Sequence, residues 1–154
     1  MSTSLPREGR LVGVDFGTVR IGIAISDARQ TLASPLDNYT RGSQGQDTEY
    51  FRKLVSEETL VGFVVGLPVH MSGDESQKSQ AARAWGKWLA DVTGLPVDFY
   101  DERYSSAIAD DLLAIGQLTK KQRQRYRDML AAQVILASYL ESDRRPSDQT
   151  SLGD

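Results

Sequence analysis

The sequence of 154 residues contains no cysteine and a single histidine, His70. Without cysteine the chain can form no disulfide, no thiolate nucleophile and no cysteine-ligated zinc site. A hydrolase built on a serine and a histidine would have to pass every proton through His70. That residue is more typical of a surface or hydrogen-bonding histidine than of a catalyst. Carboxylates are therefore the side chains left to carry out catalysis.

The sequence also lacks a long hydrophobic run and an excess of positive charge. No stretch approaches the roughly 18 apolar residues of a transmembrane helix, and the first ten residues lack the apolar run of a signal peptide, so we expect a cytoplasmic protein without a membrane partner. Its 18 Lys and Arg against 21 Asp and Glu give a net charge of −3. This balance excludes nucleic-acid binding through overall charge but allows it through a local patch. The length predicts a single domain at residues 1–143 and a disordered polar tail at 144–154.

The hydrophobic pattern predicts strands and helices in an α/β order. Strands are expected at 11–14, 19–26, 31–39, 60–67 and 97–100, and helices at 49–57, 75–93, 105–115 and 120–142. The tight connection between the first two strands indicates an antiparallel hairpin, and each helical crossover places the next strand parallel to the first. We therefore expect a mixed five-stranded sheet, three antiparallel strands followed by two parallel ones, with helices on both faces. Trp85 and Trp88 lie on the apolar face of their helix and are expected in the core.

Acidic residues stand at the ends of predicted strands. Asp15 ends the first strand, and Asp101 and Glu102 end the fifth, so both positions meet at the sheet edge where α/β folds bind ligands. Asp128 lies on the apolar stripe of the last helix, where an unpaired charge would be costly. Carboxylate oxygens without sulfur or nitrogen ligands predict Mg²⁺ or Mn²⁺, and two such ions about 3.5–4 Å apart can cleave a phosphodiester. Alternation along the strand makes one of Asp101 and Glu102 the direct ligand, and Glu102 has the longer reach.

Structural roles for the same acids are alternatives. Asp15 can cap the turn at Gly17–Thr18, and Arg103 can neutralise an acid at the strand end. Asp128 can form a salt bridge with Arg103 or with Arg125.

Positive charge gathers just before Asp128. Five cations fall within eight residues, Lys120, Lys121, Arg123, Arg125 and Arg127. This cluster is a candidate phosphate-binding patch, and its alternative is a solvated helix start. Cations in a first turn oppose the helix dipole, which favours the functional interpretation. The segment 69–74 is expected to form a loop over the site.

An ordered set of motifs spans nearly the whole chain. These are GVDFGT at 13–18 with RIG at 20–22 and SD at 26–27, GLP at 66–68 with Met71 and Gly73, DERYSS at 101–106, and Asp128 with AA at 131–132 and IL at 135–136. In order and spacing the set resembles the YqgF family, also called RuvX, whose members are described as pre-16S rRNA nucleases and Holliday junction resolvases. The resemblance implies an RNase H-like fold and a metal-dependent nuclease acting on structured RNA or branched DNA.

The resemblance also implies roles for particular residues. The catalytic, metal-binding acids would be Asp15, Glu102 and Asp128, with Asp101 as a further candidate ligand. The residues expected to contact substrate are Thr18, Arg20, Arg103, Lys121, Arg123 and Arg125.

Several functions remain open at the level of sequence. The first is hydrolysis of a phosphodiester at the 5′ end of precursor 16S rRNA, and its nearest rival is resolution of a four-way DNA junction. Junction resolution needs a homodimer, since two strands are cut symmetrically, whereas rRNA processing allows a monomer. A non-catalytic RNA-binding assembly factor is the third. An ATPase of the actin and sugar-kinase type, which shares the Asp-x-Gly-Thr motif, is disfavoured because it closes two domains over its nucleotide.

Overall fold

The computed structural model describes residues 5–68, 76–102 and 119–142. Its elements, in chain order, are β1 (Arg10–Asp15), β2 (Arg20–Ser26), β3 (Ala33–Thr40), α1 (Gln44–Glu58), β4 (Leu60–Leu67), α2 (Gln77–Thr93), β5 (Val97–Asp101) and α4 (Lys120–Glu141). The expected loop at 69–74, the expected helix at 105–115 and the tail at 144–154 lie outside the described residues.

The strands form one five-stranded sheet in the order β3-β2-β1-β4-β5. β2 pairs antiparallel with both β1 and β3, whereas β4 pairs parallel with both β1 and β5. The predicted mixed sheet is therefore confirmed. The parallel pairs follow from the helical crossovers, and the antiparallel pairs from the short hairpins. As a result the carboxyl ends of β1, β4 and β5 lie along one edge.

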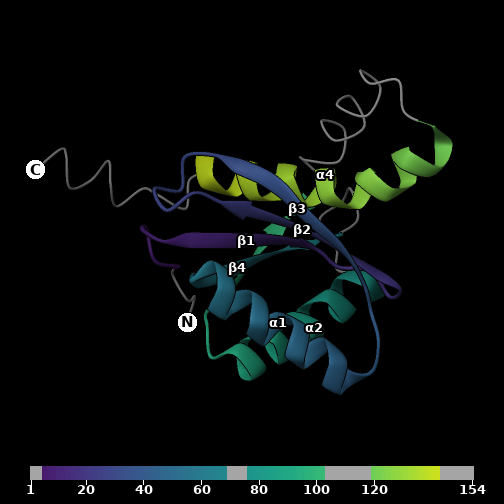
Figure 1. Cartoon of the computed structure of the whole chain (residues 1–154), viewed down its shortest axis with the longest axis horizontal. Helices are drawn as coiled ribbons and strands as arrows, with labels where there is room; N and C mark the ends of the chain where they lie inside the picture. The colour runs from purple at the N-terminus through teal and green to yellow at the C-terminus, as the bar shows by residue number, and fades with distance from the viewer. Residues whose placement is uncertain (1–4, 69–75, 103–118, 143–154) are drawn as a thin grey trace, which may run out of the picture.

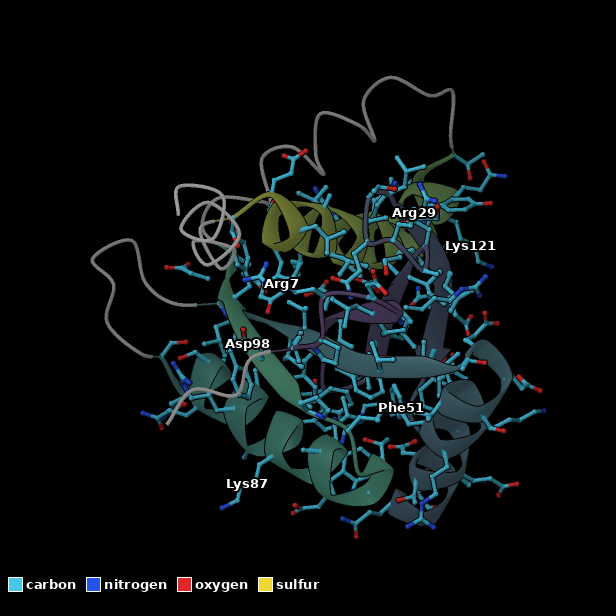
Figure 2. The ribbon with its side chains drawn as sticks, turned by 90° about the vertical axis from the view of Figure 1, so that its left-hand side faces the viewer. Arg7, Arg29, Phe51, Lys87, Asp98 and Lys121 are labelled. Carbon is cyan, nitrogen blue, oxygen red and sulfur yellow. The ribbon has the colours of Figure 1, made fainter. Side chains whose placement is uncertain are left out.

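Helices cover both faces of the sheet, as the sequence predicts (Figure 1). α1 and α2 lie together on one face, where the core includes Val14, Phe51 and Trp85, and Phe51 lies between the sheet and these helices (Figure 2). α4 covers the other face, where Leu11 and Ile135 are buried. Alternate residues of each strand supply the two cores. Trp85 is buried and Trp88 packs against the same cluster, so their assignment to the core is confirmed.

Helix α1 begins earlier than the sequence analysis predicts, at Gln44 instead of residue 49. The start is fixed by a capping box, in which the Ser43 hydroxyl accepts from the backbone N–H of Gln46 at 3.1 Å and the Gln46 side chain accepts from the Ser43 N–H at 2.8 Å. This pairing satisfies backbone donors that the first turn leaves open. The segment is polar and contains glycine, so its composition alone predicts a loop. The capping pair is the signal that it begins a helix.

Helix α4 has two unlike halves. Its second half packs on the sheet, with Ala132, Leu136 and Tyr139 buried. In its first half the side chains of Lys120 and Lys121 are exposed, and Figure 1 shows these first turns, in green, rising away from the sheet. Asp128 lies where the two halves meet. No helix in the described segments is both long and apolar enough to cross a membrane.

Candidate active site

Asp15 is the last residue of β1, and its side chain lies on the face of the sheet that α4 covers. Two residues earlier on the same strand, a Cβ added at Gly13 would lie 2.7 Å from Leu136 Cβ of α4. Alternation along the strand gives Asp15 the same face as Gly13. Asp15 is half-buried and pairs across the hairpin with Gly22 of β2. The carboxylate therefore stands at the sheet edge, beneath α4.

Close packing of α4 on Gly22 places Asp128 near Asp15. A Cβ at Gly22 would overlap the main-chain carbonyl of Asp128 and lie 2.9 Å from its Cβ. The helix backbone can therefore rest directly on β2 only because residue 22 has no side chain. Since Gly22 is the register partner of Asp15, this contact sets Asp128 beside the end of β1.

Glu102 reaches the same place from the other side. It follows β5 directly, and a Cβ at Gly66 of β4 would lie 2.6 Å from Glu102 Oε2 and 2.6 Å from Ile135 Cδ1 of α4. The Glu102 carboxylate therefore lies over β4, on the face that α4 covers. Asp101 has Leu67 as its register partner, and Leu67 belongs to the core of the opposite face. Of the two candidate acids, Glu102 is the one on the face of Asp15.

Burial and nearby negative charges raise the pKa values of Asp15 and Glu102. Burial, followed by the charges of Glu102 and Asp128, raises the pKa of Asp15 from its ordinary value of 3.8 to about 8. Burial and the neighbouring charge of Asp101 also raise the pKa of Glu102. A bound cation would oppose both pKa shifts, because its positive charge stabilises the ionised carboxylates. Without one, Asp15 holds its proton at neutral pH.

The donor set fits a hard divalent cation in its chemistry. Every candidate ligand is a carboxylate, the group that Mg²⁺ and Mn²⁺ prefer, and the glycines on β2 and β4 let Asp128 and Glu102 approach the sheet closely. Across residues 5–68, 76–102 and 119–142, no three acids already stand in the arrangement that encloses an ion. Glu102 and Asp128 would have to draw closer to Asp15 around a cation.

Two predicted substrate contacts lie near the acids. Arg20 begins β2, and its Nε is 3.6 Å from Asp128 Oδ2, with 43% of the Arg20 side chain exposed. This ion pair is not one of the two that the sequence suggested for Asp128. The partners suggested there, Arg103 and the side chain of Arg125, lie outside the described residues. Thr18 is exposed in the β1–β2 hairpin.

The remaining predicted contacts extend away from the acids. Lys121 is exposed in the first turn of α4, seven residues before Asp128 and thus about 10 Å away along the helix axis. The side chain of Arg123 lies outside the described residues.

Sequence reasoning missed Arg41. Its Nη1 donates to the carbonyl oxygens of Gly17 at 3.3 Å and Thr18 at 3.4 Å, and its guanidinium lies 5.2 Å from the ring centroid of Phe16. Arg41 therefore supports the turn that follows Asp15. Its position depends on pairing between β2 and β3, so no local motif could have revealed it.

Comparison with known proteins identifies the family. The family model described as "RuvX: Holliday junction resolvase" matches residues 9–142. The protein named "Putative pre-16S rRNA nuclease" of Rhodopirellula baltica is 43% identical over 139 residues, which cover 90% of this chain and 80% of that protein. The chain belongs to the RuvX family. A RuvX relative of the same name in Rhodobacter capsulatus is 39% identical over 140 residues, covering 91% of this chain and 88% of that protein.

Solved structures agree on the fold of this RuvX protein. The structure titled "T. thermophilus RuvC in complex with Holliday junction substrate" superposes with a TM-score of 0.55 at 16% identity, covering 86% of this chain and 95% of that one. The fowlpox virus resolvase, solved with Holliday junction DNA, gives a TM-score of 0.55 at 10% identity, covering 86% of this chain and 97% of that one. At these identities the similarity establishes the fold, which is the RNase H-like fold expected from the sequence.

Proposed function

We propose that this RuvX protein is a metal-dependent nuclease that hydrolyses a phosphodiester bond in precursor 16S rRNA. One observation carries the proposal, the convergence of Asp15, Glu102 and Asp128 on one face at the carboxyl end of β1, close enough that the other two charges help raise the pKa of Asp15 to about 8. The names of the curated relatives support the choice of RNA. Precursor rRNA as the substrate would place the protein in the cytoplasm.

Asp15, Glu102 and Asp128 are the residues that would hold Mg²⁺ or Mn²⁺. When bound, such an ion lowers the pKa of a water molecule and stabilises charge on the phosphate oxygens. Asp15 is the group that must give up a proton before it can act as a ligand, because its pKa lies above neutral pH in the metal-free protein. Its burial also excludes bulk water from one side of the reacting phosphate, which strengthens every charge interaction there.

The cations have separable tasks in this proposal. Arg20 stands 3.6 Å from Asp128 and is exposed, so its guanidinium can contact a phosphate oxygen beside the acids. Lys120 and Lys121, at the outer end of α4, can hold the backbone of the flanking strand. Arg20 would therefore act on the scissile phosphate, and the lysines on overall affinity.

A four-way DNA junction is a second candidate substrate. The family description and the fold shared with two resolvases favour it. Symmetric cleavage of a junction would require two copies of the chain, each presenting its acids to one strand. The chemistry at Asp15 would be the same for both substrates.

The test is a cleavage assay with both substrates in Mg²⁺ and in Mn²⁺. We expect the wild-type protein to cleave precursor 16S rRNA. We expect Asp15→Asn, Glu102→Gln and Asp128→Asn each to lose at least about 100-fold in rate, since losing a group that merely supports a metal ligand already costs about 10–100-fold. Asp91→Asn is the matched control, because Asp91 is exposed on α2, and it should cleave at the wild-type rate.

The outcomes separate the candidates. Cleavage of the junction at paired positions, with precursor RNA left intact, would make the protein a resolvase. RNA binding without cleavage of either substrate, unchanged by Asp15→Asn, would make it a non-catalytic assembly factor and overturn the proposal. Chelation of the metal should abolish cleavage while leaving circular dichroism unchanged.

A further inference from the structure

A cavity of about 170 Å³ opens on the face of the sheet opposite to α4. It is lined by Arg41, Gly42, Gln44, Asp47, Trp85 and Trp88. These residues come from the segment between β3 and α1, from the start of α1 and from α2. The two helices lie side by side in Figure 1. We refer to it as the tryptophan cavity. Its volume is below the roughly 300–1,000 Å³ of sites for drug-sized ligands, so it suits a single ring system.

Trp85 forms a fixed wall of this cavity. Its side chain is 7% exposed. The ring is held by Phe16, Phe51 and Trp88, whose centroids lie 5.1, 5.5 and 5.8 Å away. The cavity therefore has a rigid aromatic side, the kind of surface on which a nucleobase stacks.

The tryptophan cavity is joined to the active site through Phe16 and Arg41. Phe16 follows Asp15 directly and packs on Trp85. Arg41 lines the cavity, and its guanidinium bonds the carbonyls of Gly17 and Thr18. The hairpin that follows Asp15 is therefore in contact with two residues that line the cavity.

Asp47 holds Arg41 in this position. The buried Asp47 carboxylate is 3.6 Å from Arg41 Nε and accepts hydrogen bonds from the Tyr39 hydroxyl at 2.6 Å and the Gly42 N–H at 2.8 Å. Its charge is thus met by donors from three residues. Arg41 remains the cation at the rim, well placed for a phosphate that accompanies a base.

We propose that the tryptophan cavity receives one unpaired nucleobase of the substrate strand, next to the phosphate held at Asp15. The half-exposed ring of Trp88 offers a stacking surface, and Arg41 lines the same cavity as the cation for the phosphate of that nucleotide. The inference rests on the proposed nuclease function for its substrate class, and it adds a subsite that reads the single-stranded character of the strand. Duplex nucleic acid, whose bases are stacked and paired, would not fill this subsite.

Intrinsic fluorescence tests this directly, because Trp85 and Trp88 are the two tryptophans of the chain. The full chain is titrated in EDTA with oligoadenylate, with an abasic strand of the same length, and with free AMP. We expect oligoadenylate to quench the fluorescence and to bind about tenfold more tightly than the abasic strand, the effect of stacking one base. Equal affinity for the two strands would overturn the proposal, as would binding of AMP as tight as that of oligoadenylate, which would indicate a free-nucleotide site.

Two variants locate the effect. Trp88→Leu should lose about tenfold in affinity for oligoadenylate and none for the abasic strand. Trp85→Phe keeps the aromatic wall and should bind both strands like wild type. A further control is Tyr139→Phe, which removes a buried hydroxyl donor to Asp98 on the opposite face and should also bind both strands like wild type. Wild-type affinity of Trp88→Leu for oligoadenylate would refute the subsite.

Binding in EDTA is independent of cleavage. Base-dependent binding without cleavage in metal would keep the subsite and reject the nuclease. Cleavage without base-dependent binding would keep the nuclease and reject the subsite.

Discussion

Replacing Asp15 by asparagine should stabilise the metal-free protein in alkaline solution. Asparagine has nearly the shape of aspartate but carries no charge. In the folded protein the pKa of Asp15 is raised from 3.8 to about 8 by burial and by the charges of Glu102 and Asp128. Ionised Asp15 is therefore unfavourable in the native state unless a cation balances it.

The sign of the effect follows from proton binding. Between pH 3.8 and about 8 the unfolded chain has released the Asp15 proton while the folded protein keeps it, so the free energy of unfolding falls as the pH rises through this window and levels off above it. A shift of about four pKa units corresponds to on the order of 5 kcal/mol. Asp15 is half-buried and its neighbours can move apart, so we expect a measured loss of at least about 2 kcal/mol.

The assay is urea unfolding followed by circular dichroism in EDTA, at about pH 4.5 and about pH 9. At the lower pH wild type and Asp15→Asn should differ little, and at the higher pH the variant should be the more stable. Asp91→Asn, the exposed control on α2, should follow wild type throughout. Added Mg²⁺ at high pH should stabilise wild type more than Asp15→Asn. If Asp15→Asn is no more stable than wild type at pH 9, burial and the neighbouring charges do not raise the pKa of Asp15.

Three further predictions concern the surroundings of the acids. Lys121→Ala should weaken RNA binding and lower the slope of log affinity against log salt by about 1, whereas Lys87→Ala, on the outer side of α2 (Figure 2), should change neither in a filter-binding titration. Gly22→Ala should cost about 1–3 kcal/mol in urea unfolding because its Cβ meets the backbone of α4. Gly45→Ala, whose Cβ would meet only Ser43 Oγ at 4.0 Å, should be neutral or gain up to about 1 kcal/mol. Arg20→Met should lower kcat with a stability change within about 0.5 kcal/mol, since exposed ion pairs contribute little; an unchanged kcat would remove Arg20 from the site.

The strand directions could be predicted from the sequence because the connections dictate them. A hairpin of a few residues between β1 and β2 forces an antiparallel pair, and the crossover through α1 forces β4 parallel to β1. The predicted start of α1 was wrong by five residues. The true start depends on a side-chain pair, Ser43 with Gln46, within a stretch that otherwise has loop composition.

The candidate site was predictable only in part. Asp15 and Glu102 mark the ends of strands that must share an edge, so their proximity follows from topology. The position of Asp128 does not, because it depends on how closely α4 approaches β2 at Gly22. The support of the hairpin by Arg41 was equally hidden, since it arises from contacts between segments distant in sequence.

Helix α4 is packed against the sheet at one end only. Its second half is fixed by buried side chains such as Leu136, while its first turns, with Lys121, stand clear of the sheet. Its 22 residues make it about 33 Å long. Asp128 lies where the packed half begins. In the function that we propose, a substrate strand bound at Lys121 would therefore be connected, through one helix, to an acid beside the cleaved bond.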